Sequence, residues 1–217
     1  MWEKLIYLAT KKENIQPPVE DGKIDLPNDE VFKEVAEDLE IELDLLKAFV
    51  KVESGSQNDL NGRVIIRWEP HIFKRYSKVQ INVHGSRGRI NDECQGNEYE
   101  AFRRGCSVEK GKWKEQAYMS ASWGMGQIMG FHYKRLKFIS PQALAEWIGA
   151  SDDNGIRSIG QFIATNSKLL KACRTKDYHR IAVYYNGGYY EKYAPEGQQY
   201  DDKIKREYER LTAGKSK

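Results

Sequence analysis

The chain has 217 residues, of which 40% are hydrophobic and 31% are charged, a composition typical of one sizeable globular domain. Its 35 Lys and Arg residues stand against 32 Asp and Glu residues, and the formal charge of +3 is too small to indicate nucleic-acid binding. The apolar runs are short and interrupted, so we expect no membrane insertion.

The first residues, MWEKLIYLATKK, lack the pattern of a secretory signal, because their apolar stretch is short and no small-residue cleavage site follows. We therefore expect a protein made in the cytoplasm without a signal peptide, or a piece of a longer chain. Proline-containing breaks and weak periodicity predict an N-terminal extension over residues 1–28. Residues 29–212 are expected to form one domain, and residues 213–217 a tail.

The cysteines and histidines give no sign of a metal site. Cys94, Cys106 and Cys173 are too few for a disulfide framework, and no pair of them has the spacing of zinc ligands. The four histidines are scattered, so we expect neither a metal nor another cofactor. Cys94 and Cys106 could close a loop by pairing, but we favour thiols that remain unpaired.

The first two predicted helices lie before residue 56. Apolar residues at helical spacing indicate a first helix through Leu39, which Asn28 or Asp29 can cap. The second has one apolar face that ends in Glu53, and Gly55 fits its C-terminus. A carboxylate at the end of a buried helix is costly. General acid catalysis on a sugar, however, requires a carboxyl group that apolar surroundings keep protonated near neutral pH.

A short β pattern follows this helix. Asn61-Gly62 is a strong hairpin turn signal, and residues 63–68, RVIIRW, are rich in β-branched side chains. We therefore predict a small β-hairpin beside Glu53, followed by a helical turn or two near residues 72–76. Residues 77–96 are polar and Gly-rich, which predicts a long surface loop and a candidate substrate-binding segment.

The rest of the chain is mostly helical in pattern. Residues 122–130, SWGMGQIMG, interrupt it with three glycines among apolar side chains, which indicates close backbone approach. Helices are predicted over residues 97–104, 113–121, 141–147, 151–170, 177–185 and 200–211. The fold class is therefore α+β and predominantly α.

Three segments together resemble a known superfamily. E-S-G at residues 53–55, G-x-G-Q-I at 124–128 and Y-N-G-G at 185–188 follow one another as E-S, G-L-M-Q and A-Y-N-A-G do in goose-type lysozymes and soluble lytic transglycosylases. Four longer segments, FVKVESGS, RVIIRWEPHIF, EYEAF and SASWGMGQIMGFHY, resemble the N-acetylmuramidase domain of phage endolysins and some bacterial toxins. The resemblance extends from about residue 31 to residue 211.

The resemblance implies a lysozyme-like domain with its β-hairpin beside a catalytic cleft. It implies that Glu53 is the general acid and that Gln127 lines the cleft. Tyr185 and Asn186 match a Tyr-Asn pair at the cleft floor, where the tyrosine can hydrogen-bond the catalytic carboxyl. We also expect Trp123 to contact substrate by stacking on a sugar ring, with core packing as the alternative. The sequence departs from the superfamily at Gly126, where a larger residue is usual, and at Gly187-Gly188.

A second carboxylate is usual in glycoside hydrolysis, and its distance from the acid distinguishes retention from inversion. We favour Glu69, which follows the predicted strand, with Arg67 on the same face to hold it ionised. A structural ion pair of Glu69 with Arg67 or His71 is the alternative. Asp59 is the second candidate for this role.

The expected function is hydrolysis of the β-1,4 bond between N-acetylmuramic acid and N-acetylglucosamine in peptidoglycan. We expect a monomer that acts on the cell wall in the periplasm or outside the cell, as a bacteriolytic endolysin or an antibacterial effector. An immunity protein is an expected partner only of an effector. The alternatives are a lytic transglycosylase, which gives anhydromuropeptides, and an inactive wall-binding or phage-structural module.

Overall fold

A computed structural model of the chain describes residues 29–55, 58–60, 62–81, 92–193, 195 and 197–214. The predicted extension at 1–28 lies outside the described residues. So do residues 82–91, which are half of the loop predicted over 77–96, Asn61 of the predicted turn and residues 215–217 of the predicted tail. The loop prediction is wrong at residues 92–96, which are the start of a helix.

Helices account for most of the described chain. In chain order the α-helices are α2 (Asp29–Leu39), α3 (Leu43–Ser54), α4 (Pro70–Ser77), α5 (Asp92–Ser107), α6 (Lys114–Met119), α7 (Pro141–Gly149), α8 (Asp152–Ala164), α9 (Ser167–Arg174), α10 (Tyr178–Tyr185) and α11 (Tyr200–Ala213). Three short 3₁₀ segments connect them: η1 (Val108–Gly111), η2 (Gly130–His132) and η3 (Tyr190–Tyr193).

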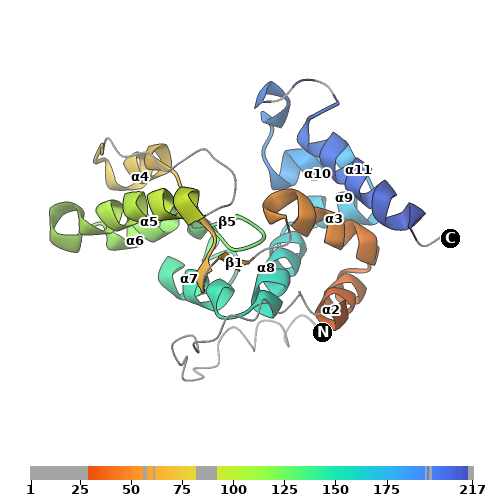
Figure 1. Cartoon of the computed structure of the whole chain (residues 1–217), viewed down its shortest axis with the longest axis horizontal. Helices are drawn as coiled ribbons and strands as arrows, with labels where there is room; N and C mark the ends of the chain where they lie inside the picture. The colour runs from red at the N-terminus through yellow and green to blue at the C-terminus, as the bar shows by residue number, and fades with distance from the viewer. Residues whose placement is uncertain are drawn as a thin grey trace.

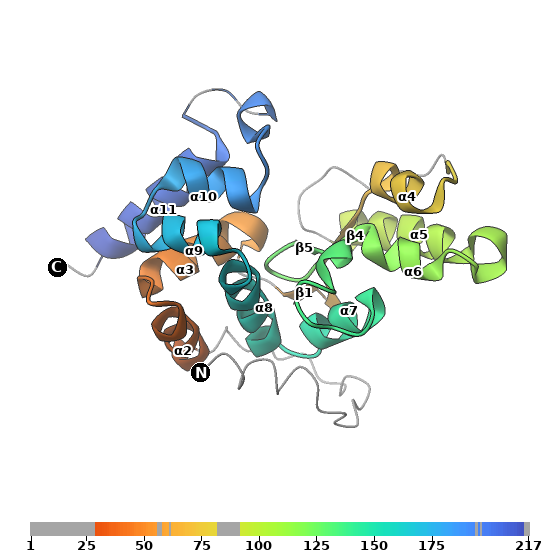
Figure 2. The same ribbon diagram turned by 180° about the vertical axis from the view of Figure 1, so that it is seen from behind.

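The helices form two groups with the strands between them (Figure 1). One group holds α4, α5 and α6, and the other holds α2, α3, α9, α10 and α11. Figure 2 shows the same separation from behind, with α7 and α8 below the strands. The C-terminal helix α11 packs against α3, the second described helix, so segments far apart in the sequence lie side by side.

Local signals set most helix boundaries. Gly55 ends α3 with a φ of 68°, and its N–H donates to the Lys51 carbonyl at 3.0 Å. Ser140, Ser151 and Asp177 cap α7, α8 and α10 by accepting hydrogen bonds from backbone N–H groups in the first turn. These starts and stops are as predicted.

The single helix predicted over residues 151–170 is wrong, because the structure divides it into α8 and α9. The hydroxyl of Thr165 donates to the Gln161 carbonyl at 2.8 Å. The Asn166 side chain accepts from the Leu169 N–H at 3.2 Å and caps α9. These side chains offer the backbone local partners that compete with a continuous helix.

The strands form two small antiparallel sheets. β1 (Asp59–Leu60) pairs with β2 (Arg63–Val64), which confirms the predicted hairpin. The sequence pattern did not predict the second sheet, of order β3-β4-β5. In it, β3 (Ile66–Trp68) pairs with β4 (Ala121–Trp123), which turns back through the glycine segment into β5 (Ile128–Met129). The glycine segment is therefore the turn of a second hairpin.

Cys94 and Cys106 both lie on α5. Since an α-helix rises about 1.5 Å per residue, they are separated by about 18 Å along its axis. A disulfide requires Cα atoms less than about 7 Å apart. The two cysteines therefore cannot close a loop with each other.

Candidate active site

Glu53 lies in the last turn of α3, where its half-buried carboxylate accepts a hydrogen bond from the Tyr200 hydroxyl. Tyr200 is the first residue of α11 and is buried. Burial raises the pKa of Glu53 to about 7, against the opposing effects of the Tyr200 hydrogen bond and the charge of Arg67. A substantial fraction of this carboxyl is therefore protonated at neutral pH.

Tyr185 lies in the same aromatic cluster but has a different hydrogen-bond partner. Its hydroxyl donates to the carbonyl oxygen of Gly126 at 2.9 Å. Its ring stacks on Tyr200, with centroids 6.2 Å apart and planes 13° apart. The hydrogen bond expected from Tyr185 to Glu53 therefore comes from Tyr200 instead. Burial and the charge of Glu53 hold the pKa of Tyr185 well above its usual range, so its phenol stays protonated.

The side chain of Gln127 forms hydrogen bonds within the turn of the β4–β5 hairpin. Its side-chain oxygen accepts from the Ser122 hydroxyl at 2.9 Å, and its side-chain nitrogen donates to the Gly124 carbonyl at 2.9 Å. Its backbone has a φ of 46°, a left-handed conformation that non-glycine residues rarely adopt. The contacts of Gln127 thus hold the glycine turn in shape, and its predicted contact with substrate stays a prediction.

Asn58 fixes this turn to the helices behind it. Its side-chain oxygen accepts from the Met125 N–H at 3.0 Å. Its side-chain nitrogen donates to the carbonyls of Ile148 and Ser151, at 2.9 and 3.0 Å. The residue is buried, and it lies just after the Glu53 helix. Sequence reasoning missed it, because a single asparagine between a helix and a hairpin has no distinguishing pattern.

Two glycines of the turn allow close packing. Gly124 has a φ of 64°, and a Cβ there would lie 2.3 Å from Ile148 and 2.5 Å from Asn58. A Cβ on Gly126 would lie 2.5 Å from Ile159 of α8. The departure from the superfamily at Gly126 therefore has a local reason, since α8 occupies the space that a side chain would need.

Trp123 is a core residue, which contradicts its predicted contact with substrate. Its side chain is 3% exposed, and its indole N–H donates to the Tyr118 carbonyl at 3.2 Å. Its ring stacks on Tyr118 with centroids 5.4 Å apart. On a three-residue strand that is buried throughout, no face of the indole is open to a sugar.

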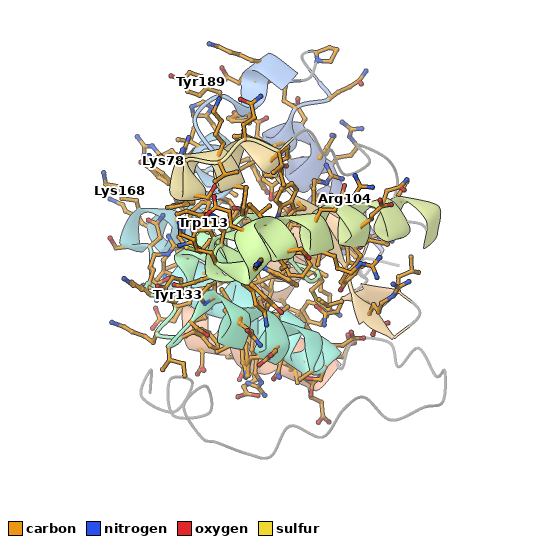
Figure 3. The ribbon with its side chains drawn as sticks, turned by 90° about the vertical axis from the view of Figure 1, so that its left-hand side faces the viewer. Lys78, Arg104, Trp113, Tyr133, Lys168 and Tyr189 are labelled. Carbon is orange, nitrogen blue, oxygen red and sulfur yellow. The ribbon has the colours of Figure 1, made fainter. Side chains whose placement is uncertain are left out.

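Asn186 lies at the exposed C-terminus of α10, where its N–H donates to the Ala182 carbonyl at 2.9 Å. Nearby, Tyr189 is 66% exposed and projects at the top of the molecule in Figure 3. The structure therefore leaves Asn186 accessible, and its proposed contact with substrate stays a prediction.

Glu69 follows β3 and immediately precedes α4. Its carboxylate lies 3.3 Å from Nδ1 of His71. This is one of the two pairings expected if Glu69 has a structural role instead of a catalytic one. Arg67, two residues earlier on the same strand, lowers the pKa of Glu53 by its charge. One short strand thus brings Arg67 into electrostatic reach of the acid and carries Glu69 at its end. Asp59 is exposed and lies on β1.

Side chains of α5 hydrogen-bond the backbone of β3 along the edge that faces away from β4. Gln95 accepts from the Ile66 N–H at 2.9 Å and donates to the Ile66 carbonyl at 3.1 Å. The buried carboxylate of Glu98 accepts from the Trp68 N–H at 2.7 Å, and burial raises its pKa. These bonds fix the strand that carries Arg67, and no sequence pattern predicts them.

Neither a metal centre nor a membrane span emerges from the described part of the chain. Within those residues, no group of three or more His, Cys, Asp or Glu side chains is arranged to hold a metal ion. None of the described helices combines the length and the apolar character needed to cross a bilayer.

A family model described as N-acetylmuramidase matches residues 42–212. The chain belongs to the N-acetylmuramidase family. This muramidase is also similar in structure to the endolysin of Burkholderia phage AP3, at 25% sequence identity and a TM-score of 0.69. The match covers 89% of this chain and 74% of the endolysin. The comparison with curated proteins gives no match.

These similarities confirm the predicted family and its mostly helical α+β fold. They also confirm the predicted activity in outline, as a peptidoglycan hydrolase.

Proposed function

We propose that this muramidase cleaves the β-1,4 bond between N-acetylmuramic acid and N-acetylglucosamine, with Glu53 as the general acid. The observation that carries the proposal is the environment of Glu53, a carboxyl with a pKa of about 7 beside a tyrosine hydroxyl. A general acid acts best when its pKa lies near the working pH.

In the proposed reaction, protonated Glu53 donates its proton to the glycosidic oxygen as the bond to the sugar breaks. The departing sugar takes that proton, and Glu53 becomes a carboxylate that the Tyr200 hydroxyl stabilises. Positive charge develops on the sugar ring that remains. Glu69 either stabilises this charge or positions the attacking water. The water supplies the new hydroxyl, and its other proton goes to the carboxylate of Glu53 or Glu69, which restores the acid over the cycle.

The second carboxylate can be identified by comparing Glu69→Gln with Asp59→Asn. We expect Glu69→Gln to lower the rate by about a hundredfold or more, as loss of a positioned acid–base group does. Asp59→Asn should retain most of the activity. The reverse order would assign the role to Asp59, and full activity of both variants would exclude a second carboxylate at either position.

A lytic transglycosylase is the nearest alternative, because it uses one carboxyl as acid and then as base. Mass spectra of digested sacculi distinguish the two reactions. Products with reducing N-acetylmuramic acid ends support the proposal. Anhydromuropeptides would replace it with transglycosylation, and reducing N-acetylglucosamine ends would show that the other glycosidic bond is cleaved.

An inactive wall-binding or phage-structural module is the alternative of another class. Binding to sacculi in a pull-down, with no fall in turbidity of the same sacculi, would support it. The protonated acid argues against this reading, since binding a glycan does not require one.

The likeness to a phage endolysin favours a lytic role over that of a secreted effector. We propose a bacteriolytic monomer that acts on the wall from the periplasm or from outside the cell. Lysis of cells with a permeabilised outer membrane by the purified protein supports this role. Lysis that requires delivery to the periplasm of a competitor, together with a protective immunity protein, would favour the effector.

A further inference from the structure

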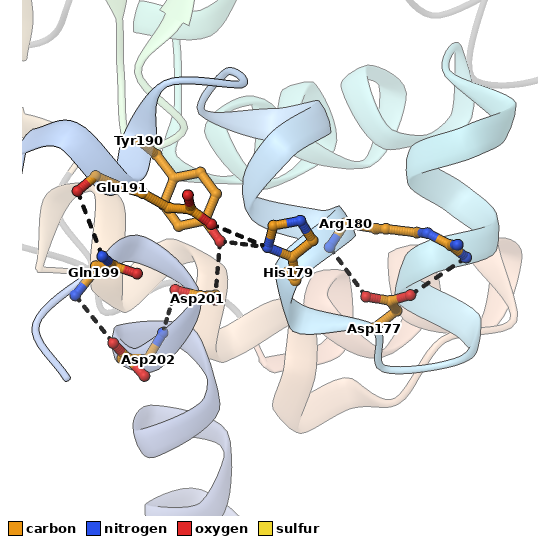
Figure 4. A network of polar contacts seen from close by, with 8 residues as sticks. All are labelled: Asp177, His179, Arg180, Tyr190, Glu191, Gln199, Asp201 and Asp202. Atoms are coloured by element: carbon orange, nitrogen blue, oxygen red, sulfur yellow. Dashed lines mark hydrogen bonds and ion pairs between the residues drawn. The ribbon is translucent and has the colours of Figure 1, made fainter. Parts of the chain in front are cut away.

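Tyr190, in η3, lies at the centre of a polar network beside the first turn of α11 (Figure 4). Its buried hydroxyl donates to the Asp201 carboxylate at 2.9 Å and lies 2.8 Å from Nδ1 of His179 on α10. Because the only hydroxyl proton goes to Asp201, a hydrogen bond to His179 requires that Nδ1 carry a proton. His179 also lies 3.5 Å from the Glu191 carboxylate.

A second set of bonds fixes the same helix start. Gln199 and Asp202 form a capping box, in which the Gln199 N–H donates to the Asp202 carboxylate at 3.2 Å. Asp202 in turn donates its own N–H to Asp201 at 3.0 Å. Tyr200 lies between these residues in sequence, so its backbone is held on both sides.

We propose that Tyr190 is a positioning residue: by holding Asp201, it fixes the first turn of α11 and so keeps the Tyr200 hydroxyl on the Glu53 carboxylate. Its effect on the reaction rests on the proposed role of Glu53 as the acid. Its effect on the protonation of Glu53 does not, and the latter can be measured without substrate.

Loss of the Tyr190 contact should change the pKa of Glu53 in one direction. The Tyr200 hydrogen bond stabilises the ionised form of Glu53, so a loosened Tyr200 leaves the carboxyl with a higher pKa. Among the described residues, the other groups coupled electrostatically to Glu53 are the Tyr185 phenol from α10 and the Arg67 guanidinium from β3. Neither belongs to the network around Tyr190, so both should act equally in the parent and in a Tyr190 variant.

The test is an NMR titration of the Glu53 carboxyl carbon in protein with ¹³C-labelled glutamate, assigned by its loss in Glu53→Gln. We expect Tyr200→Phe to raise the pKa of Glu53 by roughly 0.5 to 1 unit. Tyr190→Phe should raise it by a smaller amount. Tyr208→Phe is the matched control, because Tyr208 also lies on α11 and donates to a carboxylate, that of Glu42, away from the acid.

A double variant tests whether Tyr190 acts through Tyr200. In the Tyr200→Phe background, adding Tyr190→Phe should give no further shift, because the contact that it positions is gone. An unchanged pKa in folded Tyr190→Phe, or an equal shift in both backgrounds, would overturn the proposal. So would a rise in Tyr208→Phe as large as that in Tyr190→Phe.

Asp201→Ala, which removes the acceptor of the Tyr190 hydroxyl, keeps the test valid if Tyr190→Phe does not fold. Removing a negative charge would by itself lower the pKa of Glu53, whereas a loosened Tyr200 raises it. A rise therefore supports the proposal and a fall contradicts it. Because the titration needs no turnover, failure of this inference is distinct from failure of the proposed function, which would appear as activity in Glu53→Gln.

Discussion

The Tyr200 hydroxyl donates a hydrogen bond to the Glu53 carboxylate from 147 residues further along the chain. Glu53 lies in the last turn of α3 and Tyr200 begins α11, and the two helices pack against each other. The environment of the acid therefore forms only when the last helix docks on the second described one. Protonation of Glu53 should thus report on the docking of α11.

The activity of the muramidase should fall as pH rises through about 7, because the proposed mechanism needs protonated Glu53. Tyr200→Phe removes a contact that lowers this pKa and should move the alkaline limb to higher pH. The loss of turbidity of purified sacculi, followed across pH at constant ionic strength, measures the alkaline limb of the parent and of the variant. A limb at the same pH in the variant would contradict the role of the hydrogen bond.

Arg67 is expected to have an effect of the same sign through its charge. Arg67→Met should raise the pKa of Glu53 and shift the alkaline limb upward, whereas Arg67→Lys retains the charge and should keep most of the parent profile. Raising the salt concentration should reduce the difference between parent and Met variant. Identical shifts in both variants would mean that shape, not charge, is responsible.

Glu53 should destabilise the fold at alkaline pH. A pKa raised from 4.5 to about 7 means that the native state favours the protonated form. The contribution of protonated Glu53 to the stability of the native state is full below pH 4.5 and is lost as pH rises through 7. Glu53→Gln should therefore be more stable than the parent above pH 7, by up to about 3 kcal/mol, and the gain should shrink toward pH 5.

Urea unfolding at pH 5 and pH 8 measures that difference. Glu42→Gln is the control of opposite sign, because hydrogen bonds from Lys176 and Tyr208 lower the pKa of Glu42. It should lose stability at pH 8 rather than gain it. A Glu53→Gln variant that is equally stable relative to the parent at both pH values would contradict the raised pKa.

Gly126 and Gly96 form a matched pair for testing the packing of the glycine turn. Gly126→Ala should cost about 1–3 kcal/mol of unfolding free energy, since its Cβ would lie 2.5 Å from Ile159. A Cβ on Gly96 of α5 would meet open space, and Ala there should be neutral or stabilising by about 0.5–1 kcal/mol. Equal losses for both variants would contradict the close approach.

Sequence patterns predicted what depends on neighbouring residues. Glu53 and Gly55 follow from one apolar helical face and its glycine stop. Pro141 in the first turn of α7, Ser151 as the cap of α8 and Asp177 at the start of α10 are likewise local signals. The order of the three motifs then indicated the family, although none of them is specific alone.

The unpredicted parts depend on contacts between distant segments. Tyr200 lies in a polar stretch, GQQYDDK, and only the packing of α11 on α3 places it beside Glu53. Gln95 and Glu98 serve as edge partners of β3 because α5 lies alongside that strand. Trp123 was assigned to the substrate because an indole suits both a sugar face and a core, and sequence does not distinguish these uses.

In the proposed reaction, Glu53 supplies the proton that breaks the glycosidic bond. The most direct test of this role is the release of reducing ends from purified sacculi by Glu53→Gln, with folding verified by circular dichroism. Glutamine keeps the shape of the side chain but cannot serve as the acid, so we expect activity to fall by about 10²- to 10⁴-fold or more. Activity of the folded variant near that of the parent would contradict the account.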